Sequence, residues 1–116
     1  MKRMPEGVRD AINAELSAAR SATTTEARWH CLERAHILSQ AWAISHAGVH
    51  ARMLVHAVRQ RDRHEAIGQV VRLIVAAPGS LSGRYPLGNT GRSSVGLMTP
   101  MSVPADLEAV LASTRT

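Results

Sequence analysis

The stretch that decides the fold is residues 26–60, EARWHCLERAHILSQAWAISHAGVHARMLVHAVRQ. It is rich in alanine, the strongest helix former, and its apolar residues recur at the three- and four-residue spacing of one helix face. The first half predicts a helix that runs to about residue 38 or 40 and buries Trp29, Leu32 and Ala35. The second half predicts a helix over residues 42–60 whose apolar stripe consists of Ala47, Ala51, Leu54 and Val58.

The sequence on the N-terminal side predicts one more helix, from about Pro5 to Arg20. Proline suits the first turn, where its missing N–H leaves no hydrogen bond unmade. Thr23 followed by Glu26 has the form of a capping box, which predicts the start of the next helix. The buried stripe of the first helix is predicted to be Val8, Ile12, Leu16 and Ala19.

A fourth helix is expected after Asp62, which stands three residues before Glu65 and repeats the capping-box spacing. We expect Pro78 and Gly79 to end this helix. Its core positions are predicted to be Ile67, Val70, Val71 and Ile74.

The remaining residues predict a covering loop and a short final helix. Residues 79–103 are rich in glycine and proline, but their apolar side chains are too many for a solvated tail. We therefore expect an ordered loop that lies across the helices. Residues 104–113 predict a helix that turns Leu107, Val110 and Leu111 inward.

These elements predict an all-α fold: two antiparallel helical hairpins made of four main helices, a long ordered loop and a short C-terminal helix. A chain of 116 residues is long enough for one small core. We expect a single helical domain over residues 1–116, with a helical core (1–78), a Gly/Pro-rich covering loop (79–103) and a short helix (104–113).

The composition indicates a soluble cytoplasmic protein. No apolar run reaches the roughly 18–20 residues of a membrane span, and the start, MKRMPEGVRD, has no apolar stretch typical of a secretory signal. Cys31 is the one cysteine, which excludes an intrachain disulfide. The net charge of +5 is ordinary for a surface of this size. We expect no nucleic-acid partner, because no recognition helix or aromatic platform accompanies the basic residues Arg59, Arg61 and Arg63.

The best functional clue is the distribution of the histidines, all six of which lie between His30 and His64. His46 and His50 are four residues apart and share one helix face, and Glu33 stands three residues before His36. Imidazole and carboxylate are the usual ligands of zinc and iron. If the second and third helices are antiparallel, the four side chains can converge on one zinc- or iron-like ion, or on a small ligand, between them.

Two further readings of the histidines stay open. Glu15 borders the buried stripe of the first helix and is a candidate additional ligand. The Glu-x-x-His spacing is that of carboxylate-bridged di-iron bundles, but this chain has one such motif, so a single ion is the better interpretation. Alternatively, histidines beside an apolar stripe are core residues bonded to local carbonyl or carboxylate groups. His30, His56 and His64 are expected at the surface.

Three other motifs predict little chemistry. The segment 87–94, LGNTGRSS, could present backbone N–H groups to an anion, but a glycine-rich turn of the covering loop is the preferred interpretation. Met98 and Met101 could be soft ligands for Cu(I), and we expect a hydrophobic role for them instead. No set of residues forms a convincing catalytic group, so an enzyme is the least supported of the possible functions.

A faint internal repeat is a clue to the architecture and not to the function. Glu26, Leu32 and Ala35 match Glu65, Val71 and Ile74 at a constant offset of 39 residues. Stacked helical hairpins of this kind are typical of helical-repeat adaptors. The alternative function is a non-catalytic helical module, resembling a short helical-repeat adaptor, that binds a protein partner, or a second copy as a homodimer, through its apolar surface and Trp42.

Several segments resemble a small family of uncharacterised bacterial proteins with a domain of unknown function. The resemblance is carried by WHCLERAHILSQ (29–40), HAGVHARML (46–54), RQRDRHE (59–65), PLGNTGRSS (86–94) and MTPMSVPADL (98–107). It spans about residues 27–111. It implies a compact bacterial domain in which the helices and the GNTG loop belong together, and it assigns no reaction to any residue.

Overall fold

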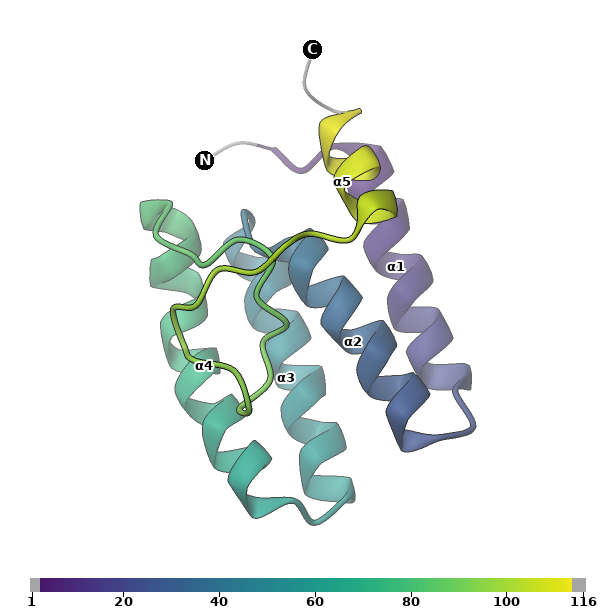
Figure 1. The fold of residues 1–116 in the computed structure, drawn as a ribbon, viewed down its shortest axis with the longest axis vertical. Coiled ribbons are helices and arrows are strands. Elements are labelled where there is room, and N and C mark those ends of the chain that lie inside the picture. Colours follow the sequence, from purple (N-terminus) through teal and green to yellow (C-terminus); the bar gives the residue numbers. More distant parts are fainter. Residues whose placement is uncertain (1–2, 114–116) are drawn as a thin grey trace.

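The structure, a computed structural model, describes residues 3–113 and folds them into five helices with no strand in that range. Figure 1 shows two antiparallel hairpins side by side, with the long loop 83–104 crossing the second hairpin and the last helix lying against the first. The predicted all-α architecture is thus confirmed. The helices are α1 (Glu6–Ser21), α2 (Thr25–Ser39), α3 (Ala43–Arg59), α4 (Arg63–Ser82) and α5 (Ala105–Ala112).

Two apolar clusters hold α1, α2, α3 and α5 together, and they confirm the predicted faces of three of these helices. On α2, Trp29, Leu32 and Ala35 are buried against Val49, Met53 and Ala57 of α3. On α1, Val8, Ile12 and Ala19 are buried, with Leu16 packed beside them. On α5, Leu107 is buried, while Val110 and Leu111 pack against the same cluster.

The N-terminal caps agree with one prediction and correct the other. Asp62 caps α4, because its carboxylate accepts a hydrogen bond of 3.0 Å from the Glu65 N–H. The cap of α2 is Thr24 and not Thr23: its hydroxyl accepts from the Ala27 N–H at 3.1 Å. Residues 23–25 are all threonine, and any of them could cap the helix. The capping-box spacing to Glu26 therefore predicts Thr23 instead of Thr24.

The helix α4 continues to Ser82 and does not end at Pro78 and Gly79. Pro78 removes one backbone hydrogen bond, but it lies on the exposed side of the helix, where water can solvate the released carbonyl. The helix ends instead at Gly83, whose φ of 73° is left-handed, and the next N–H, that of Arg84, bonds to the Gly79 carbonyl at 2.9 Å. The covering loop therefore starts about four residues later than expected.

The buried face predicted for α4 is wrong, and the face predicted for α3 is only half-buried at Ala47, Ala51 and Leu54. Val58 is 59% exposed, and the inward face of α3 is rotated so that it carries His46 and His50 together with Val49, Met53 and Ala57. On α4 the predicted core positions Ile67 and Ile74 are 67% and 70% exposed, and Val70 and Val71 are also exposed. The buried residues of α4 are Glu65, Gln69, Ala76 and Ser80.

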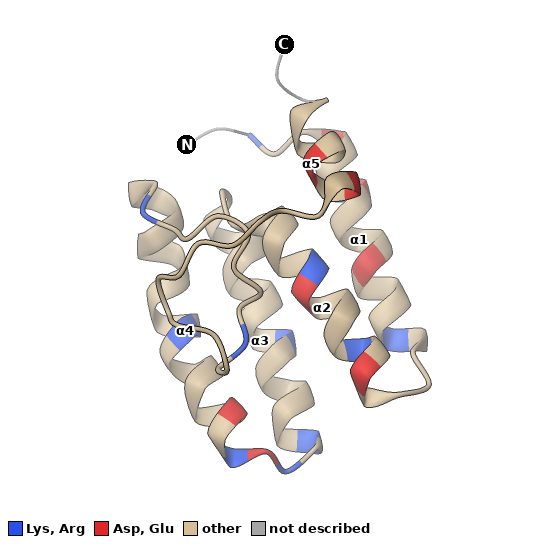
Figure 2. Cartoon of the chain, viewed as in Figure 1, with Lys and Arg blue, Asp and Glu red and all other residues tan. Residues whose placement is uncertain are grey.

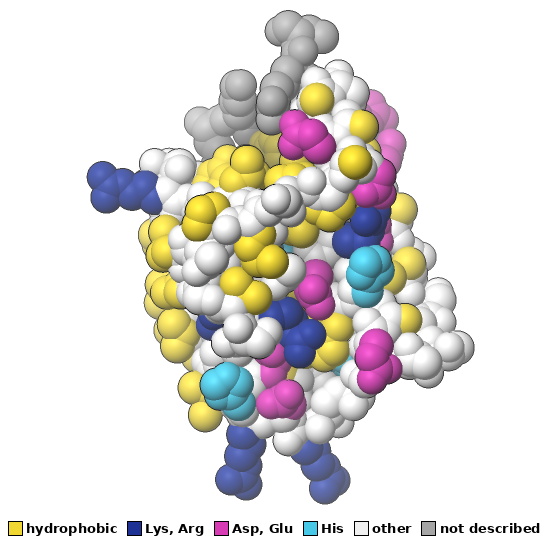
Figure 3. Space-filling model, viewed as in Figure 1, with side chains coloured by type: hydrophobic (Ala, Val, Ile, Leu, Met, Phe, Trp, Pro, Cys, Tyr) yellow, Lys and Arg dark blue, Asp and Glu magenta, His cyan; other side chains and the backbone are white. Residues whose placement is uncertain are grey.

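The second hairpin therefore has a polar interior and an apolar exterior. Figure 3 shows hydrophobic side chains along the edge of the molecule where α4 runs. The proposed repeat fails for the same reason, because Leu32 and Ala35 are buried while their counterparts Val71 and Ile74 are exposed. Buried polar groups are stable only when each has a hydrogen-bond partner. The hydrogen bonds inside the second hairpin therefore determine how its buried polar side chains are oriented.

The basic residues lie where they were expected. Arg59, Arg61 and Arg63 are exposed around the turn between α3 and α4, which Figure 2 shows as a group of basic residues at one end of the hairpin. No helix in residues 3–113 has the length and apolar character needed to cross a membrane.

Candidate metal centre

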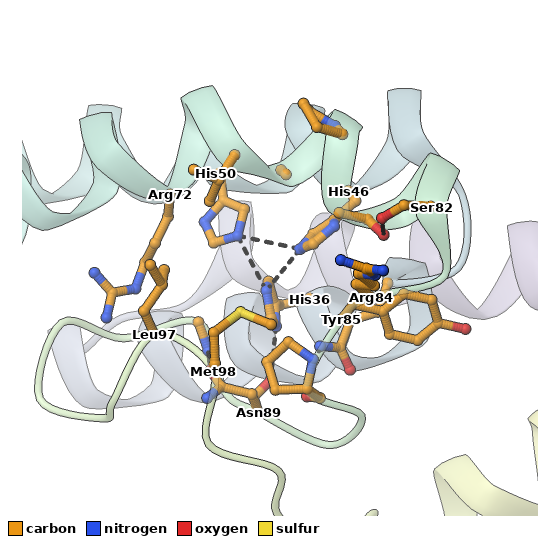
Figure 4. Close-up of a pocket in the computed structure, with 17 residues that line it drawn as sticks. His36, His46, His50, Arg72, Ser82, Arg84, Tyr85, Asn89, Leu97 and Met98 are labelled. Atoms are coloured by element: carbon orange, nitrogen blue, oxygen red, sulfur yellow. Dashed lines mark hydrogen bonds between the residues drawn. The ribbon is translucent and has the colours of Figure 1, made fainter.

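Three of the four predicted ligands meet inside the molecule. His36 comes from the last turns of α2, and His46 and His50 come from successive turns of α3. All three are buried, with exposed fractions of 3–5%. Their Nε2 atoms form a triangle: 3.0 Å from His36 to His50, 3.0 Å from His36 to His46 and 3.2 Å from His46 to His50. Figure 4 shows the three rings pointing toward one another.

The other ring nitrogen of each histidine has its own partner, and these partners decide where the ring protons are. His36 Nδ1 lies 2.7 Å from the Asn89 carbonyl, which can only accept. His46 Nδ1 lies 2.8 Å from the Ser80 hydroxyl, which already donates its proton to the Gln40 carbonyl at 2.6 Å. Both Nδ1 atoms must therefore donate, and both carry the proton of the neutral ring.

The third ring, that of His50, is held in the same way. Its Nδ1 lies 2.7 Å from Gln69 Oε1. The orientation of this amide is determined because its nitrogen donates to Glu65 and to the Gly91 carbonyl, both at 2.8 Å. His50 Nδ1 therefore donates as well. In the neutral state all three Nε2 atoms are left with a lone pair, and the three lone pairs face one another.

The buried carboxylate of Glu65 fixes the Gln69 amide that holds His50. Glu65 accepts hydrogen bonds from Gln69, from Arg92 Nε at 2.8 Å and from the Ser93 N–H at 2.9 Å. Burial by itself would raise the pKa of Glu65, but these donors together lower it, so the carboxylate stays ionised. The Arg92 guanidinium also lies 3.7 Å from the centre of the Trp29 ring, a cation–π contact that ties the loop to α2.

The loop segment 87–94 packs against the histidines, through Asn89 and Gly91, and its predicted role is that of a turn and not of an anion-binding loop. Gly91 has a φ of +84° and packs so closely on His36 that an added Cβ would lie 2.8 Å from the ring. Asn89 is buried, its backbone carbonyl bonds to His36, and its side-chain oxygen accepts from the Gly91 N–H at 2.8 Å. The turn predicted for this segment positions a ring of the candidate centre.

Above the histidines lies a cavity of about 280 Å³. Its walls come from α4 and from the covering loop, and Figure 4 shows the labelled residues arranged around the three rings. None of the described residues that line it is an acid or a cysteine, whereas Arg72 and Arg84 are cationic. A group bound at the three Nε2 atoms could thus be reached from this cavity.

The fourth predicted ligand, Glu33, is not among the grouped side chains. It lies 3.4 Å from Arg92 in an ion pair and is about a quarter exposed. Burial raises its pKa, while Arg92 opposes this effect. Glu15, the additional candidate, is bonded to Arg34 at 2.8 Å. Both carboxylates are engaged by arginines outside the histidine triangle.

His56 corrects a further expectation, because it is buried and not at the surface. Its ring packs on Trp29 with centroids 4.8 Å apart, and its Nε2 lies 3.0 Å from the Thr25 hydroxyl. His30 and His64 are exposed, as expected.

The sequence did not reveal the residues that orient the rings: Gln69, Ser80 and Asn89. Gln69 and Arg72 are the two polar side chains in the otherwise apolar run 66–77, and they are the one available signal that this helix does not bury an ordinary apolar face. Asn89 belongs to the GNTG segment, which the sequence predicts to be a glycine-rich turn with no contact to the histidines. Ser80 had no recognisable signal, because it stood beyond the expected end of the helix.

Burial lowers the pKa of all three histidines: well below the usual value for His36, to about 4 for His46, and in the same direction for His50. In the metal-free protein, these rings are neutral in both states above pH 6.5. Between pH 6.5 and about 4 the unfolded chain binds protons that the folded chain does not. The free energy of unfolding therefore decreases as the pH is lowered through this range. At about 1.4 kcal/mol per pKa unit, His46 alone costs about 3 kcal/mol.

We therefore expect urea denaturation of the metal-free protein to give a free energy of unfolding that drops by about 3 kcal/mol or more between pH 7.5 and pH 4. His46→Leu, which has no titrating group at this position, should make the drop about 3 kcal/mol smaller and leave the part that comes from His36 and His50. An unfolding free energy that stays constant over this range would show that the rings are not buried in their neutral form.

One family model matches residues 6–111, and its description reads "Protein of unknown function (DUF3703)". No curated protein and no solved structure matches the chain. The match includes all three histidines and the residues that hold their Nδ1 atoms, and it agrees with the resemblance noted from the sequence. The chain belongs to this family of proteins of unknown function.

Proposed function

We propose that the protein binds a single transition-metal ion through the Nε2 atoms of His36, His46 and His50. The observation that carries the proposal is the convergence of three lone pairs at 3.0–3.2 Å with no proton to share, because each Nδ1–H is donated elsewhere. A cation at the centre turns this repulsion into attraction. A metal-binding histidine typically donates its other N–H to a carbonyl or similar acceptor.

The size of the triangle supports an ion of the first transition series. Zinc binds imidazole nitrogen at about 2.0–2.1 Å, which for a tetrahedral ion places the nitrogens roughly 3.3 Å apart. An ion bound at that distance to the triangle seen here would lie about 1 Å outside its plane. Three protein ligands and an open fourth position facing a cavity make a site for zinc or a zinc-like or iron-like ion. Glu33 is not part of the proposal.

The test is metal analysis of the untagged protein, followed by titration with zinc and with ferrous iron against a chromophoric chelator. We expect one ion per chain and a higher melting temperature of the loaded protein, because an ion that binds the folded state stabilises it. A protein that is purified free of metal and takes up neither ion at micromolar concentrations would contradict the proposal.

A second candidate function is self-association, and the apolar exterior of α4 favours it. Ile67, Val70, Val71 and Ile74 lie on one side of the helix with 44–70% of each exposed, and Val55 and Val58 of α3 are exposed as well. Contiguous apolar surface of this kind commonly marks a contact with another protein. Trp42, the other expected contact residue, is half-buried and packs against the cluster between α1, α2 and α5.

Light scattering coupled to size exclusion tests this candidate. We expect a dimer that dissociates in the variant Ile74→Glu, because a charge on the contact face must be buried on association. Leu87→Glu is the matched control, since Leu87 is 45% exposed but lies in the covering loop and not on α4. A monomer at high protein concentration would exclude self-association through this face.

A further inference from the structure

The three imidazoles leave one coordination position open, and the surrounding residues limit what can fill it. Most polar side chains around the cavity are already engaged. The Gln40 amide donates to the Pro86 carbonyl and accepts from the Gly88 N–H, both at 2.9 Å. The Ser82 hydroxyl donates to the Gly79 carbonyl. The Tyr85 ring points its hydroxyl away from the histidines (Figure 4).

Met98 is different, because it lines the same cavity and, within residues 3–113, its thioether takes part in no hydrogen bond. Figure 4 shows it among the residues that line this cavity, together with His36, His46 and His50. It is 59% exposed, so it contributes little to the apolar core. Its three rotatable side-chain bonds allow the sulfur to adapt its position.

The position of Met98 is coupled to the histidines through Asn89. The Asn89 amide nitrogen donates to the Gly96 carbonyl at 3.0 Å and to the Thr99 carbonyl at 2.7 Å, which closes the turn 96–99 around Met98. The backbone carbonyl of the same asparagine accepts from His36 Nδ1. One residue therefore holds both a ring of the triangle and the turn that carries the thioether.

The charge of the surroundings favours an ion of low charge. Imidazole and thioether are neutral ligands, no acid among residues 3–113 lines the cavity, and Arg72 and Arg84 add positive charge to its walls. The cost of burying an ion rises steeply with its charge, so a monovalent ion is much less penalised here than a divalent one. Thioether sulfur is a soft ligand that selects Cu(I).

We infer that the centre is a Cu(I) site in which Met98 supplies the fourth ligand to the ion bound by His36, His46 and His50. This inference rests on the proposed metal site and narrows it to one ion. It replaces the hydrophobic role expected for Met98. Met101, its neighbour in the same segment, is 39% exposed, does not line the cavity and has no part in the site.

The experiment is an anaerobic Cu(I) titration, with ascorbate as reductant and a chromophoric Cu(I) chelator as competitor, on the wild type, Met98→Leu and Met101→Leu. Leucine has nearly the volume of methionine but no donor atom, so folding is preserved. We expect Met98→Leu to weaken Cu(I) binding about tenfold or more, with Met101→Leu like the wild type. Zinc affinity should change little in either variant. X-ray absorption should show one sulfur neighbour of copper, absent in Met98→Leu.

The outcomes separate this inference from the proposed function. If Cu(I) binds but Met98→Leu and Met101→Leu have equal affinities, or if the chain binds zinc and not Cu(I), the inference is overturned and the three-histidine site stands. If the wild type binds neither Cu(I) nor zinc nor ferrous iron, the proposed function itself fails.

Discussion

His50→Ala is expected to weaken zinc binding about a hundred- to a thousandfold. Zinc sites in small domains contribute roughly 10–16 kcal/mol through about four ligands, so one ligand accounts for about 3–4 kcal/mol, which corresponds to that loss. His50 also takes part in two of the three short Nε2 contacts and connects the triangle to Gln69. Its removal therefore affects both the coordination and the orientation of the site.

The measurement is zinc affinity by chelator competition, with His64→Ala as the matched control. His64 is an exposed histidine on α4 outside the triangle. Its loss should leave affinity and stoichiometry unchanged. Circular dichroism checks that both variants keep their helices. Equal zinc affinity in His50→Ala and His64→Ala would mean that zinc binds to surface histidines and not to the buried centre.

Gly91→Ala is expected to lower zinc affinity about a hundredfold without touching a ligand. The new methyl group would lie 2.8 Å from His36 Cδ2 and 3.0 Å from its Nε2, so the ring must move. Displaced supporting groups of metal ligands typically cost 10- to 100-fold in affinity. The covering loop cannot retreat easily, because the Gly91 carbonyl accepts from Gln69 and its N–H donates to Asn89.

Gly83→Ala is the control for backbone strain. Gly83 has a similar φ of +73°, but no atom lies within 4 Å of the position of its Cβ. Both substitutions force alanine into the left-handed region, at about 1–2 kcal/mol. The difference between them therefore reports the contact with His36 alone. If both variants bind zinc like the wild type, the loop does not position the His36 ring.

The parts of the fold that could be predicted depend on local patterns. Trp29, Leu32 and Ala35 follow the helical period, and their burial on α2 needs no knowledge of distant residues. The four-residue spacing of His46 and His50 places them on one face of any helix. Their meeting with His36 then follows from the packing of α2 and α3, neighbours joined by a short connection.

The orientation of α4 could not be predicted, because it depends on partners far away in the sequence. A hydrophobic pattern places Ile67 and Ile74 inside, yet Glu65 and Gln69 are buried instead. Their polar groups are satisfied by His50, 19 residues away from Gln69, and by Arg92, 27 residues away from Glu65. Only the folded chain brings these groups together, and without them burial of Glu65 and Gln69 would be strongly unfavourable.

Glu33 illustrates the same limit within the candidate site. Its spacing of three residues from His36 is that of a ligand pair, but Arg92, 59 residues further along the chain, pairs with it. The sequence motif could not show this competition. Arg92 also binds Glu65 and stacks on Trp29, so one arginine from the loop determines the role of two carboxylates.

The most direct test of the central claim is anomalous X-ray diffraction from crystals of the zinc-loaded protein. We expect one strong peak within the triangle of nitrogens, with His36, His46 and His50 bound through Nε2 at about 2.0–2.1 Å. Zinc located elsewhere on the chain, with the three Nε2 atoms still 3.0–3.2 Å apart and no ion between them at saturating zinc, would contradict it.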